Sequence, residues 1–328
     1  MDTQTSLFSP KYLQEEEALS QECKELISSL PKEKGWIFSH IYKYEGFWYS
    51  ARHLQGVIAC QKYFHAQESD IFLVTTPKSG TTWLKAIMFT LVNRKRYQVR
   101  ENHPLLNNNP HNLVPFLELE YMDIEQPDLS FSSSPRLFAT HFPYFLMPNS
   151  VHDFACKIVY LCRNPKDNLV SLWHFAKKLK LQATGIHSLE EAFDMFCSGL
   201  SPCGPFWDHA LHYWNESKKN SRILFLKYED MKEEPAVHLR RLAEFLGYPF
   251  SADEEETGIV EEILKLCSFD NLSNLDINKT DKKAYGMENK SFFRRGEVGD
   301  WKNHLSTEMA KKLDKITEQK FSGFGLVL

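Results

Sequence analysis

Four short apolar runs are spaced along the chain and predict buried β-strands. They are DIFLVTTP (70–77), RLFATH (136–141), KIVYLCR (157–163) and RILFLKY (222–228). Their apolar positions are nearly continuous rather than alternating, which is typical of parallel strands covered by helices on both faces. The runs therefore predict the core of a parallel sheet.

Helical patterns separate these runs. Apolar residues recur at helical spacing in 81–94, 166–180, 234–247, 258–268 and 306–320. Pro235 and Gly247 bound the third of these segments and are start and stop signals of a helix. Strands alternating with helices predict an α/β fold with a central, mostly parallel sheet flanked by helices, and the length allows one large domain or two smaller ones. In such a fold, ligands bind at the carboxyl ends of the strands.

Composition narrows the functional class. The 328 residues carry a formal net charge of −4, so no overall basic field indicates a nucleic-acid partner. Seven scattered cysteines without a C-x-x-C pair argue against a disulfide framework and a zinc site. No secretory leader and no run of ~18 apolar residues occurs, so we expect a cytosolic protein that does not enter a membrane.

Two segments lack a clear periodic pattern. Residues 1–20 are polar and acidic, and we expect a loose arm there, before the folded part of the chain. The segment 269–300 is polar and too long for a plain connection, so we expect it to be functional or mobile.

The segment TTPKSGTTWLKAI (75–87) predicts an anion site. It joins an expected strand to a helix, and a helix N-terminus presents free N–H donors and a partial positive charge. Gly80 lets the backbone approach a ligand closely, and Lys78 adds a charge among three hydroxyl groups. In a Walker loop the lysine follows the second glycine, whereas here it precedes the only one. This order argues against the magnesium nucleoside triphosphate of an ordinary P-loop.

Three further segments carry candidate chemistry. Arg163 ends an expected strand and Ser171 lies about two turns into the next helix, so both side chains could meet one phosphate. His141 follows another strand, and SFFRRGEVGDWKNHLS (291–306) contains a basic R-R-G loop at 294–296. Taken singly, each has an ordinary explanation. Arg163 could belong to a surface ion pair, His141 could be a histidine without a catalytic role, and 294–296 could be a solvated basic loop.

In this order, the four segments together resemble the cytosolic sulfotransferase family. PKSGTTW is similar to that family's 5′-phosphosulfate loop, YLCRNPKDNLVS to its 3′-phosphate motif and RRGEVGDWKN to its C-terminal nucleotide loop. The resemblance spans about residues 35–320, and LPKEKGW, NHPLL and NPHNLVPFLE resemble the plant branch. It implies a single α/β domain over 21–328 with a central, mostly parallel sheet. It also implies a metal-independent enzyme that transfers a sulfuryl group from 3′-phosphoadenosine 5′-phosphosulfate (PAPS) to a small-molecule hydroxyl, releasing adenosine 3′,5′-bisphosphate.

The resemblance also implies individual roles. His141 would accept the proton of the acceptor, while Lys78 would neutralise charge on the bridging oxygen from the opposite side of the sulfur. Trp83 would stack on the adenine. The positions that match donor-binding residues of the family are Lys78, Ser79, Gly80, Thr81, Thr82, Trp83, Arg163, Ser171, Tyr228, Ser268, Arg294, Arg295 and Gly296.

Three positions depart from the family pattern. Ala139 stands where many members have a lysine two residues before the histidine, so any contribution of that lysine is missing. R-R-G replaces the usual R-K-G, which keeps the charge but not the shape. The family's dimer motif, K-x-x-x-T-V-x-x-x-E, falls on KNHLSTEMAK (302–311), where its Thr, Val and Glu are replaced. We therefore expect a monomer.

The sequence determines the acceptor less well than the donor. Candidates are plant metabolites such as flavonoids, brassinosteroid-like steroids, hydroxyjasmonates and desulfo-glucosinolates. Five aromatic residues near the segments that flank the acceptor in this family are expected to line its pocket: Trp48, Phe142, Tyr144, Phe206 and Trp207. Two alternatives stay open, an ATP-dependent P-loop kinase and a nucleotide-binding module without catalysis.

Overall fold

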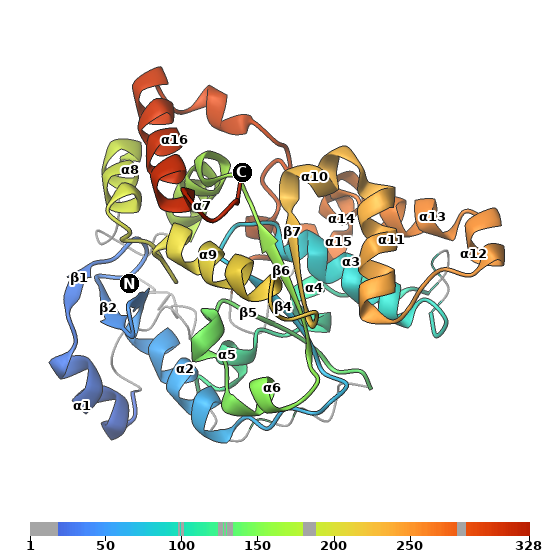
Figure 1. Cartoon of the computed structure of the whole chain (residues 1–328), viewed down its shortest axis with the longest axis horizontal. Coiled ribbons are helices and arrows are strands. Elements are labelled where there is room, and N and C mark those ends of the chain that lie inside the picture. Colours follow the sequence, from blue (N-terminus) through green and yellow to red (C-terminus); the bar gives the residue numbers. More distant parts are fainter. Residues whose placement is uncertain are drawn as a thin grey trace, which may run out of the picture.

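The computed structural model describes residues 19–97, 99, 102–123, 127, 129, 134–179, 188–280 and 287–328. Its central sheet has four parallel strands in the order β5–β4–β6–β7 (Figure 1). They are β4 (Ile71–Thr75), β5 (Leu137–Thr140), β6 (Lys157–Cys162) and β7 (Ile223–Lys227). Each lies within one of the four apolar runs, so the predicted strands and the α/β fold class are confirmed.

Two apolar cores, one on each face of the sheet, explain the continuous runs. Along β4, Phe72 and Val74 belong to one core, whereas Ile71 and Leu73 belong to the other. The first core includes α2 (Ala51–Tyr63), α7 (Pro165–Leu179), α9 (Phe206–Ser217) and α16 (Thr307–Phe321). The second includes α3 (Thr81–Asn93), α11 (Pro235–Leu246) and α13 (Ile259–Leu266). Because both faces are covered, neither strand face needs polar residues.

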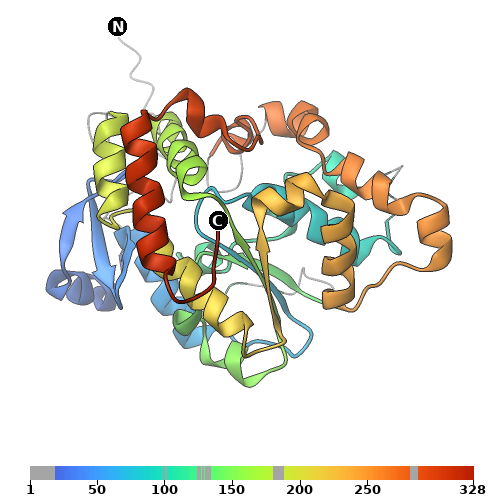
Figure 2. The same ribbon diagram turned by 45° about the horizontal axis from the view of Figure 1, so that its top comes forward.

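The five predicted helices correspond to α3, α7, α11, α13 and α16, with ends shifted by a few residues. α11 begins at Pro235 and ends against Gly247, whose φ of 82° is the left-handed conformation that glycine adopts easily. Figure 2 shows α16 packed beside α7 and α8 (Leu189–Cys197). The other helices and turns are α1 (Gln21–Ser29), α4 (Pro110–Leu113), α5 (Leu117–Glu120), α6 (Asn149–Asp153), α10 (Tyr228–Glu233), α12 (Ala252–Glu256), α14 (Phe269–Asn274), α15 (Asp276–Thr280), η2 (Pro104–Leu106), η3 (Tyr144–Leu146), η4 (Asn289–Phe292) and η5 (Asp300–Asn303).

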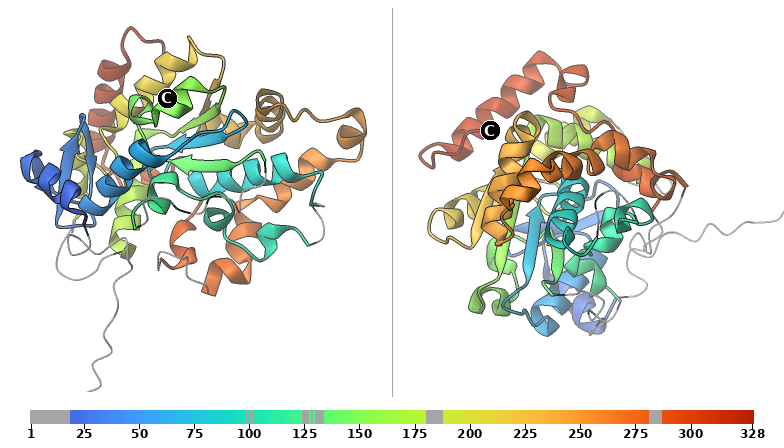
Figure 3. Two further views of the ribbon diagram at one scale, coloured as in Figure 1. Left: turned by 90° about the horizontal axis from the view of Figure 1, so that it is seen from below. Right: turned by 90° about the vertical axis from the view of Figure 1, so that its right-hand side faces the viewer.

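A second, antiparallel sheet was not predicted. It consists of β1 (Lys32–Lys34), β2 (His40–Tyr44) and β3 (Phe47–Tyr49). Glu45 and Gly46 join β2 to β3 with φ values of 47° and 88°, as a tight hairpin turn requires. This sheet lies at one end of the molecule, and α12 lies at the other (Figures 1 and 3).

The two segments without a periodic pattern differ in part from expectation. Leu19 is packed in the core and Ser20 caps α1, so these two residues of the expected arm belong to the folded domain. The rest of that arm lies outside the described residues. The segment 269–300 forms α14, α15 and η4 and reaches the start of η5, while 281–286 again lie outside the described part of the chain.

Candidate functional site

A cavity of about 240 Å³ opens at the carboxyl ends of the four parallel strands. One side chain from the segment that follows each strand lines it: Lys78 after β4, His141 after β5, Arg163 after β6 and Tyr228 after β7. Since the strand order is β5–β4–β6–β7, these side chains follow one another in the order His141, Lys78, Arg163, Tyr228. This is where an open α/β sheet binds ligands.

The loop between β4 and α3 turns sharply at two positions. Lys78 and Gly80 have φ values of 69° and 102°. A Cβ atom on Gly80 would lie 2.7 Å from Cδ2 of Tyr228, so only glycine fits between the loop and that ring. Asn168 of α7 fixes the loop, because its Nδ2 donates to the carbonyl oxygen of Pro77 at 2.8 Å and to Oγ of Ser79 at 3.0 Å. The α3 N-terminus is thereby held open toward the cavity.

The Lys78 side chain is half-buried and lies near other cations. Burial, together with Arg163, Lys178 and Arg294, lowers the pKa of Lys78 to about 7. Its Nζ lies 4.1 Å from the ring centre of Phe175 on α7, a cation–π contact. The position therefore favours an anionic ligand that would restore the full positive charge of this lysine.

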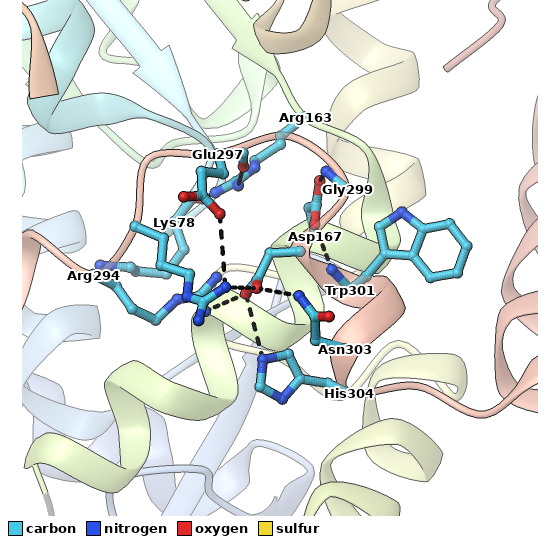
Figure 4. Close-up of polar contacts among 11 residues, drawn as sticks. Lys78, Arg163, Asp167, Arg294, Glu297, Gly299, Trp301, Asn303 and His304 are labelled. Atoms are coloured by element: carbon cyan, nitrogen blue, oxygen red, sulfur yellow. Dashed lines mark hydrogen bonds and ion pairs between the residues drawn. The ribbon is translucent and has the colours of Figure 1, made fainter.

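Arg163 joins three segments that are distant in the sequence (Figure 4). Its Nη1 donates to the carbonyl oxygen of Lys78 at 3.2 Å and its Nη2 to that of Glu297 at 2.9 Å. Its guanidinium also lies 4.6 Å from the ring centre of Tyr228. The buried Nε of Arg163 has no hydrogen-bond partner among the described residues. A buried donor without a partner is costly, so this N–H fits an anion in the cavity.

Asp167 ties the C-terminal loop to α7. This buried carboxylate accepts hydrogen bonds from the backbone N–H groups of Gly299 at 2.7 Å and Trp301 at 3.0 Å (Figure 4). Asp167 lies one turn before Ser171 on the same helix. The loop and the helix that supplies the Ser171 hydroxyl are therefore held as one unit.

Asp300 holds the two arginines of the same loop. It forms ion pairs with Arg294 and, at 2.9 Å, with Arg295, and it accepts a hydrogen bond from Asn303 at 3.1 Å. Burial opposes the charge on Asp300. The hydrogen bonds from Arg294 and Asn303 and the charges of the two arginines outweigh burial and lower the pKa of Asp300 to about 2. Arg294 thus has a carboxylate partner, while its buried Nε makes no hydrogen bond within the described part of the chain.

His141 is fixed in one tautomer. Its Nδ1 lies 2.6 Å from the carbonyl oxygen of Thr75, which can only accept, so Nδ1 carries the proton and Nε2 keeps a lone pair. The backbone N–H of His141 donates to Oε1 of Glu118 at 2.9 Å. Burial lowers the pKa of His141 to about 4, against the opposing effect of Glu118. The imidazole is therefore neutral near pH 7 and can accept a proton.

The structure brings most of the predicted donor and catalytic residues together. The lining of the cavity includes Lys78, Gly80, Thr81, Thr82, Trp83, His141, Arg163, Ser171, Tyr228, Arg294, Arg295 and Gly296. Two predicted residues lie behind this lining. Ser79 is fully buried and accepts the hydrogen bond from Asn168, and Ser268 caps α14 by accepting from the N–H of Asn271 at 3.2 Å.

The five aromatic residues expected around the acceptor are not among the residues that line this cavity. Phe142 is buried in the first apolar core, together with Phe206 and Trp207 of α9. Neighbouring residues of an extended chain point to opposite sides, so His141 faces the cavity and Phe142 faces the core. The lining instead contains other apolar side chains, which sequence position did not single out: Ile37, Phe38, Phe116, Leu119, Met122, Leu172, Phe175, Leu179 and Phe292.

One of these side chains had a signal in the sequence. Phe175 is four residues after Ser171, and residues four apart share a face of a helix. Glu118 and Thr75, which hold His141, had no such signal because their contacts are set by the fold.

No helix within the described residues is long and apolar enough to cross a membrane. The same residues contain no group of three or more His, Cys, Asp or Glu side chains arranged to hold a metal ion.

Comparisons with known proteins agree with this geometry. A sequence profile described as the sulfotransferase domain matches residues 68–325. Cytosolic sulfotransferase 12 of Arabidopsis thaliana is 52% identical over 322 residues, which cover 97% of each protein. A structure described as an Arabidopsis thaliana putative steroid sulphotransferase has 46% identity and a TM-score of 0.75 over 93% of this chain and 94% of that one. Mouse sulfotransferase SULT7A1, complexed with PAP, has 26% identity and a TM-score of 0.67 over 86% of this chain and 94% of that one. The chain belongs to the sulfotransferase family.

Proposed function

We propose that this protein transfers a sulfuryl group from PAPS to a hydroxyl group of an uncharged, apolar small molecule, with His141 as the base. The observation that carries the proposal is a single cavity with two chemically different parts. Lys78, Arg163 and Arg294 make one part cationic, while Phe116, Phe175 and other apolar side chains line the rest. His141 lines the same cavity.

The cationic part fits a nucleotide with two separate anionic groups. The loop after β4 offers backbone N–H groups and Lys78 to a 5′-phosphosulfate. Arg163, Ser171 and Arg294 offer charge-assisted hydrogen bonds to a 3′-phosphate, and the buried Nε atoms of both arginines lack a partner among the described residues. The mouse relative complexed with PAP supports this assignment.

In this proposal two residues act on the reacting groups. As the acceptor oxygen bonds to sulfur, its proton passes to Nε2 of His141, and the bond from sulfur to the phosphate oxygen breaks. Lys78 neutralises the charge that develops on that phosphate oxygen. The tautomer fixed by Thr75 leaves Nε2 ready to accept the proton. Ala139 stands where many family members have a lysine two residues before the histidine, so this proposal gives no role to a charge at that position.

The lining favours an uncharged acceptor over a carboxylate. Many of the side chains that line the cavity with His141 are aromatic or aliphatic, and His53 of this lining is already joined to Glu118 at 3.4 Å. Away from Lys78, the described residues of this part offer an acceptor carboxylate no ion pair to compensate for its lost hydration. Steroid-like and flavonoid alcohols or phenols therefore fit best, and the relative described as a putative steroid sulphotransferase supports this.

The test is incubation of the protein with PAPS and a panel of steroids, flavonoids, hydroxyjasmonates and desulfo-glucosinolates, with mass spectrometry of the products. We expect sulfated steroids or flavonoids and no sulfated carboxylates. Sulfation of only the hydroxyjasmonates would overturn the acceptor class. Stabilisation by adenosine 3′,5′-bisphosphate without any sulfated product would identify a binding module, and stabilisation by ATP alone would favour a kinase.

The names of the relatives lead us to propose a cytosolic location as well.

A further inference from the structure

A buried carboxylate lies behind the proposed base and has no part in donor binding. Glu118 of α5 is fully buried, and its Oε1 meets both the backbone N–H of His141 at 2.9 Å and Nε2 of His53 at 3.4 Å. Its Oε2 makes no hydrogen bond among the described residues. A buried anion that is only partly satisfied costs stability, so its presence calls for a functional reason.

His53 completes a short chain of polar groups. Its Nδ1 lies 3.8 Å from Sγ of Cys203, and both residues line the cavity that contains His141. Burial disfavours a charge on His53, but the carboxylate of Glu118, 3.4 Å from Nε2, opposes burial and helps to raise the pKa of His53. Burial likewise opposes the charge on Glu118, but the hydrogen bond and charge of His53 lower the pKa of Glu118 to about 2. Near pH 7 the two side chains therefore form an ion pair.

The backbone of His141 is clamped on its other side as well. Its carbonyl oxygen accepts a hydrogen bond from Nε2 of His209 at 3.1 Å, and the hydroxyl of Tyr160 donates to Nδ1 of His209 at 3.0 Å. With the ring held by Thr75, the imidazole has no freedom to move toward a new partner when it becomes charged. Any stabilisation of that charge must come from groups already in place.

We propose that Glu118 is a positioning residue for His141: its carboxylate fixes the backbone of the base and favours the positive charge that the imidazole gains with the acceptor's proton. The inference rests on the proposed role of His141 as the base. Glu118 does not touch the substrates in this assignment. It acts as an oriented anion behind the base, opposed by the cation of His53.

Few other described groups near Glu118 and His141 change charge between pH 4 and pH 8. Lys85 of α3 and His53 of α2 act against protonation of His141, and burial keeps His209 of α9 neutral by lowering its pKa to about 3. The remaining titratable neighbours of Glu118 stay protonated because burial raises their pKa: Tyr49, Cys60, Cys203 and Tyr213. The pH response of His141 therefore reports on Glu118, His53 and Lys85.

The test combines two variants with opposite expected effects. Glu118→Gln keeps an oxygen for the His141 N–H but removes the charge, and an opposite charge at this range is worth about one to three pKa units. We expect kcat with PAPS and 1-naphthol to fall about 10-fold because the base is weaker, with the KM for PAPS unchanged. His53→Gln removes the opposing cation but also raises the pKa of the buried Glu118, so the acid limb of kcat should move to higher pH where Glu118 is still ionised. Glu120→Gln, on the same helix, is the control and should match the wild type.

The ring ¹⁵N shifts of His141, titrated in the protein without substrates, provide a readout that needs no turnover. Glu118→Gln should keep His141 neutral at pH 4, where the wild type is about half protonated. If both the titration of His141 and kcat are unchanged in Glu118→Gln, the charge of Glu118 has no effect on His141. Glu118 would then only accept the backbone hydrogen bond of His141, and the proposal would be overturned. If that variant does not fold, His53→Gln decides instead: an acid limb that does not move while the carboxyl ¹³C shift shows Glu118 ionised overturns the proposal. If the wild type does not sulfate 1-naphthol, the acceptor assignment fails, and the His141 titration alone decides the role of Glu118.

Discussion

Nδ1 of His141 lies 2.6 Å from the carbonyl oxygen of Thr75, the last residue of the neighbouring strand β4. The carbonyl oxygen holds the ring proton on Nδ1, so Nε2 is the only nitrogen that can accept a proton. β4 and β5 pair in parallel register, with Val74 opposite Thr140. The register of β4 and the edge strand β5 thus sets the tautomer of the proposed base.

His141→Ala should lower kcat by about 10²–10⁴-fold, the usual contribution of a general base. The affinity for adenosine 3′,5′-bisphosphate should stay within a few fold, because none of the described contacts of the cationic residues involves the imidazole. In the wild type, kcat should stay level toward acid pH and fall only near pH 4, since burial lowers the pKa of His141 to about 4 and the neutral form is required.

Rates at saturating PAPS and calorimetric titration check this prediction. A variant that keeps more than about a tenth of the rate would remove His141 from the mechanism. An acid limb near the ordinary histidine pKa of ~6.5 would show that burial does not perturb the base.

Binding of adenosine 3′,5′-bisphosphate should take up a proton near pH 7. Burial and the neighbouring cations lower the pKa of Lys78 to about 7 in the free protein, so about half of the molecules lack its charge at that pH. A bound anion favours the ammonium and raises the pKa, so affinity should fall as pH rises from 7 to 9. Calorimetry in two buffers with different ionisation enthalpies measures the uptake. Lys78→Met should abolish it, and uptake that persists in this variant would assign the proton elsewhere.

Gly80→Ala should weaken donor binding. The left-handed φ of 102° costs a residue with a side chain roughly 1–2 kcal/mol. The added Cβ would also lie 2.7 Å from the Tyr228 ring, so the loop or the ring must move. We expect the Kd for adenosine 3′,5′-bisphosphate to rise at least about 10-fold, since 1.4 kcal/mol corresponds to a factor of ten. Gly323→Ala is the control: its φ is 80°, but no other atom lies within 4 Å, so donor affinity should not change.

The sheet and the donor loop could be predicted because both depend on local patterns. Strands covered on both faces leave uninterrupted apolar runs, as in 70–77 and 157–163. The β4–α3 loop needs a glycine and hydroxyl groups in consecutive positions beside a helix start, and these are visible in the sequence. The short antiparallel sheet was missed although Glu45 and Gly46 carry a turn signal between aromatic residues.

The supports of the site could not be predicted, because they join residues that are far apart in the chain. Glu118 meets His141 across 23 positions, and Asp167 meets Gly299 across 132 positions. An acidic residue in a short helix normally indicates a solvated surface, and no local pattern shows which distant N–H it will meet. The aromatic residues expected near the acceptor lie outside the cavity lining for a related reason: packing, not sequence position, decides that Phe142 faces the core.

The protein should be a monomer in solution. In the segment that corresponds to the family's dimer motif, Ser306, Thr307 and Lys311 are exposed and polar. A stable dimer interface needs an apolar centre, which these side chains do not supply. Light scattering at micromolar concentration should give the monomer mass of 38.3 kDa. A doubled mass that does not depend on concentration would contradict this prediction.

Arg163→Ala should remove the preference of the protein for a 3′-phosphate. Arg163 is nearly buried, and its Nε has no partner among the described residues, so a phosphate beside it gains a charge-assisted hydrogen bond. Such a bond is worth roughly 1.5–3 kcal/mol, which corresponds to about 10- to 150-fold in affinity. The affinity for adenosine 3′,5′-bisphosphate should fall by this factor, whereas the affinity for AMP should hardly change.

The comparison of the two nucleotides separates this role from a purely structural one. Arg163 also hydrogen-bonds the carbonyl oxygens of Lys78 and Glu297, so its removal could loosen both donor loops. Loosened loops would weaken AMP and adenosine 3′,5′-bisphosphate equally, and calorimetry of both ligands would show this. Arg240→Ala is the matched control, because Arg240 lies on the surface and pairs with Glu255 at 2.7 Å. Equal losses for both nucleotides in Arg163→Ala, with none in the control, would assign Arg163 to loop support and leave the 3′-phosphate to Ser171 and Arg294.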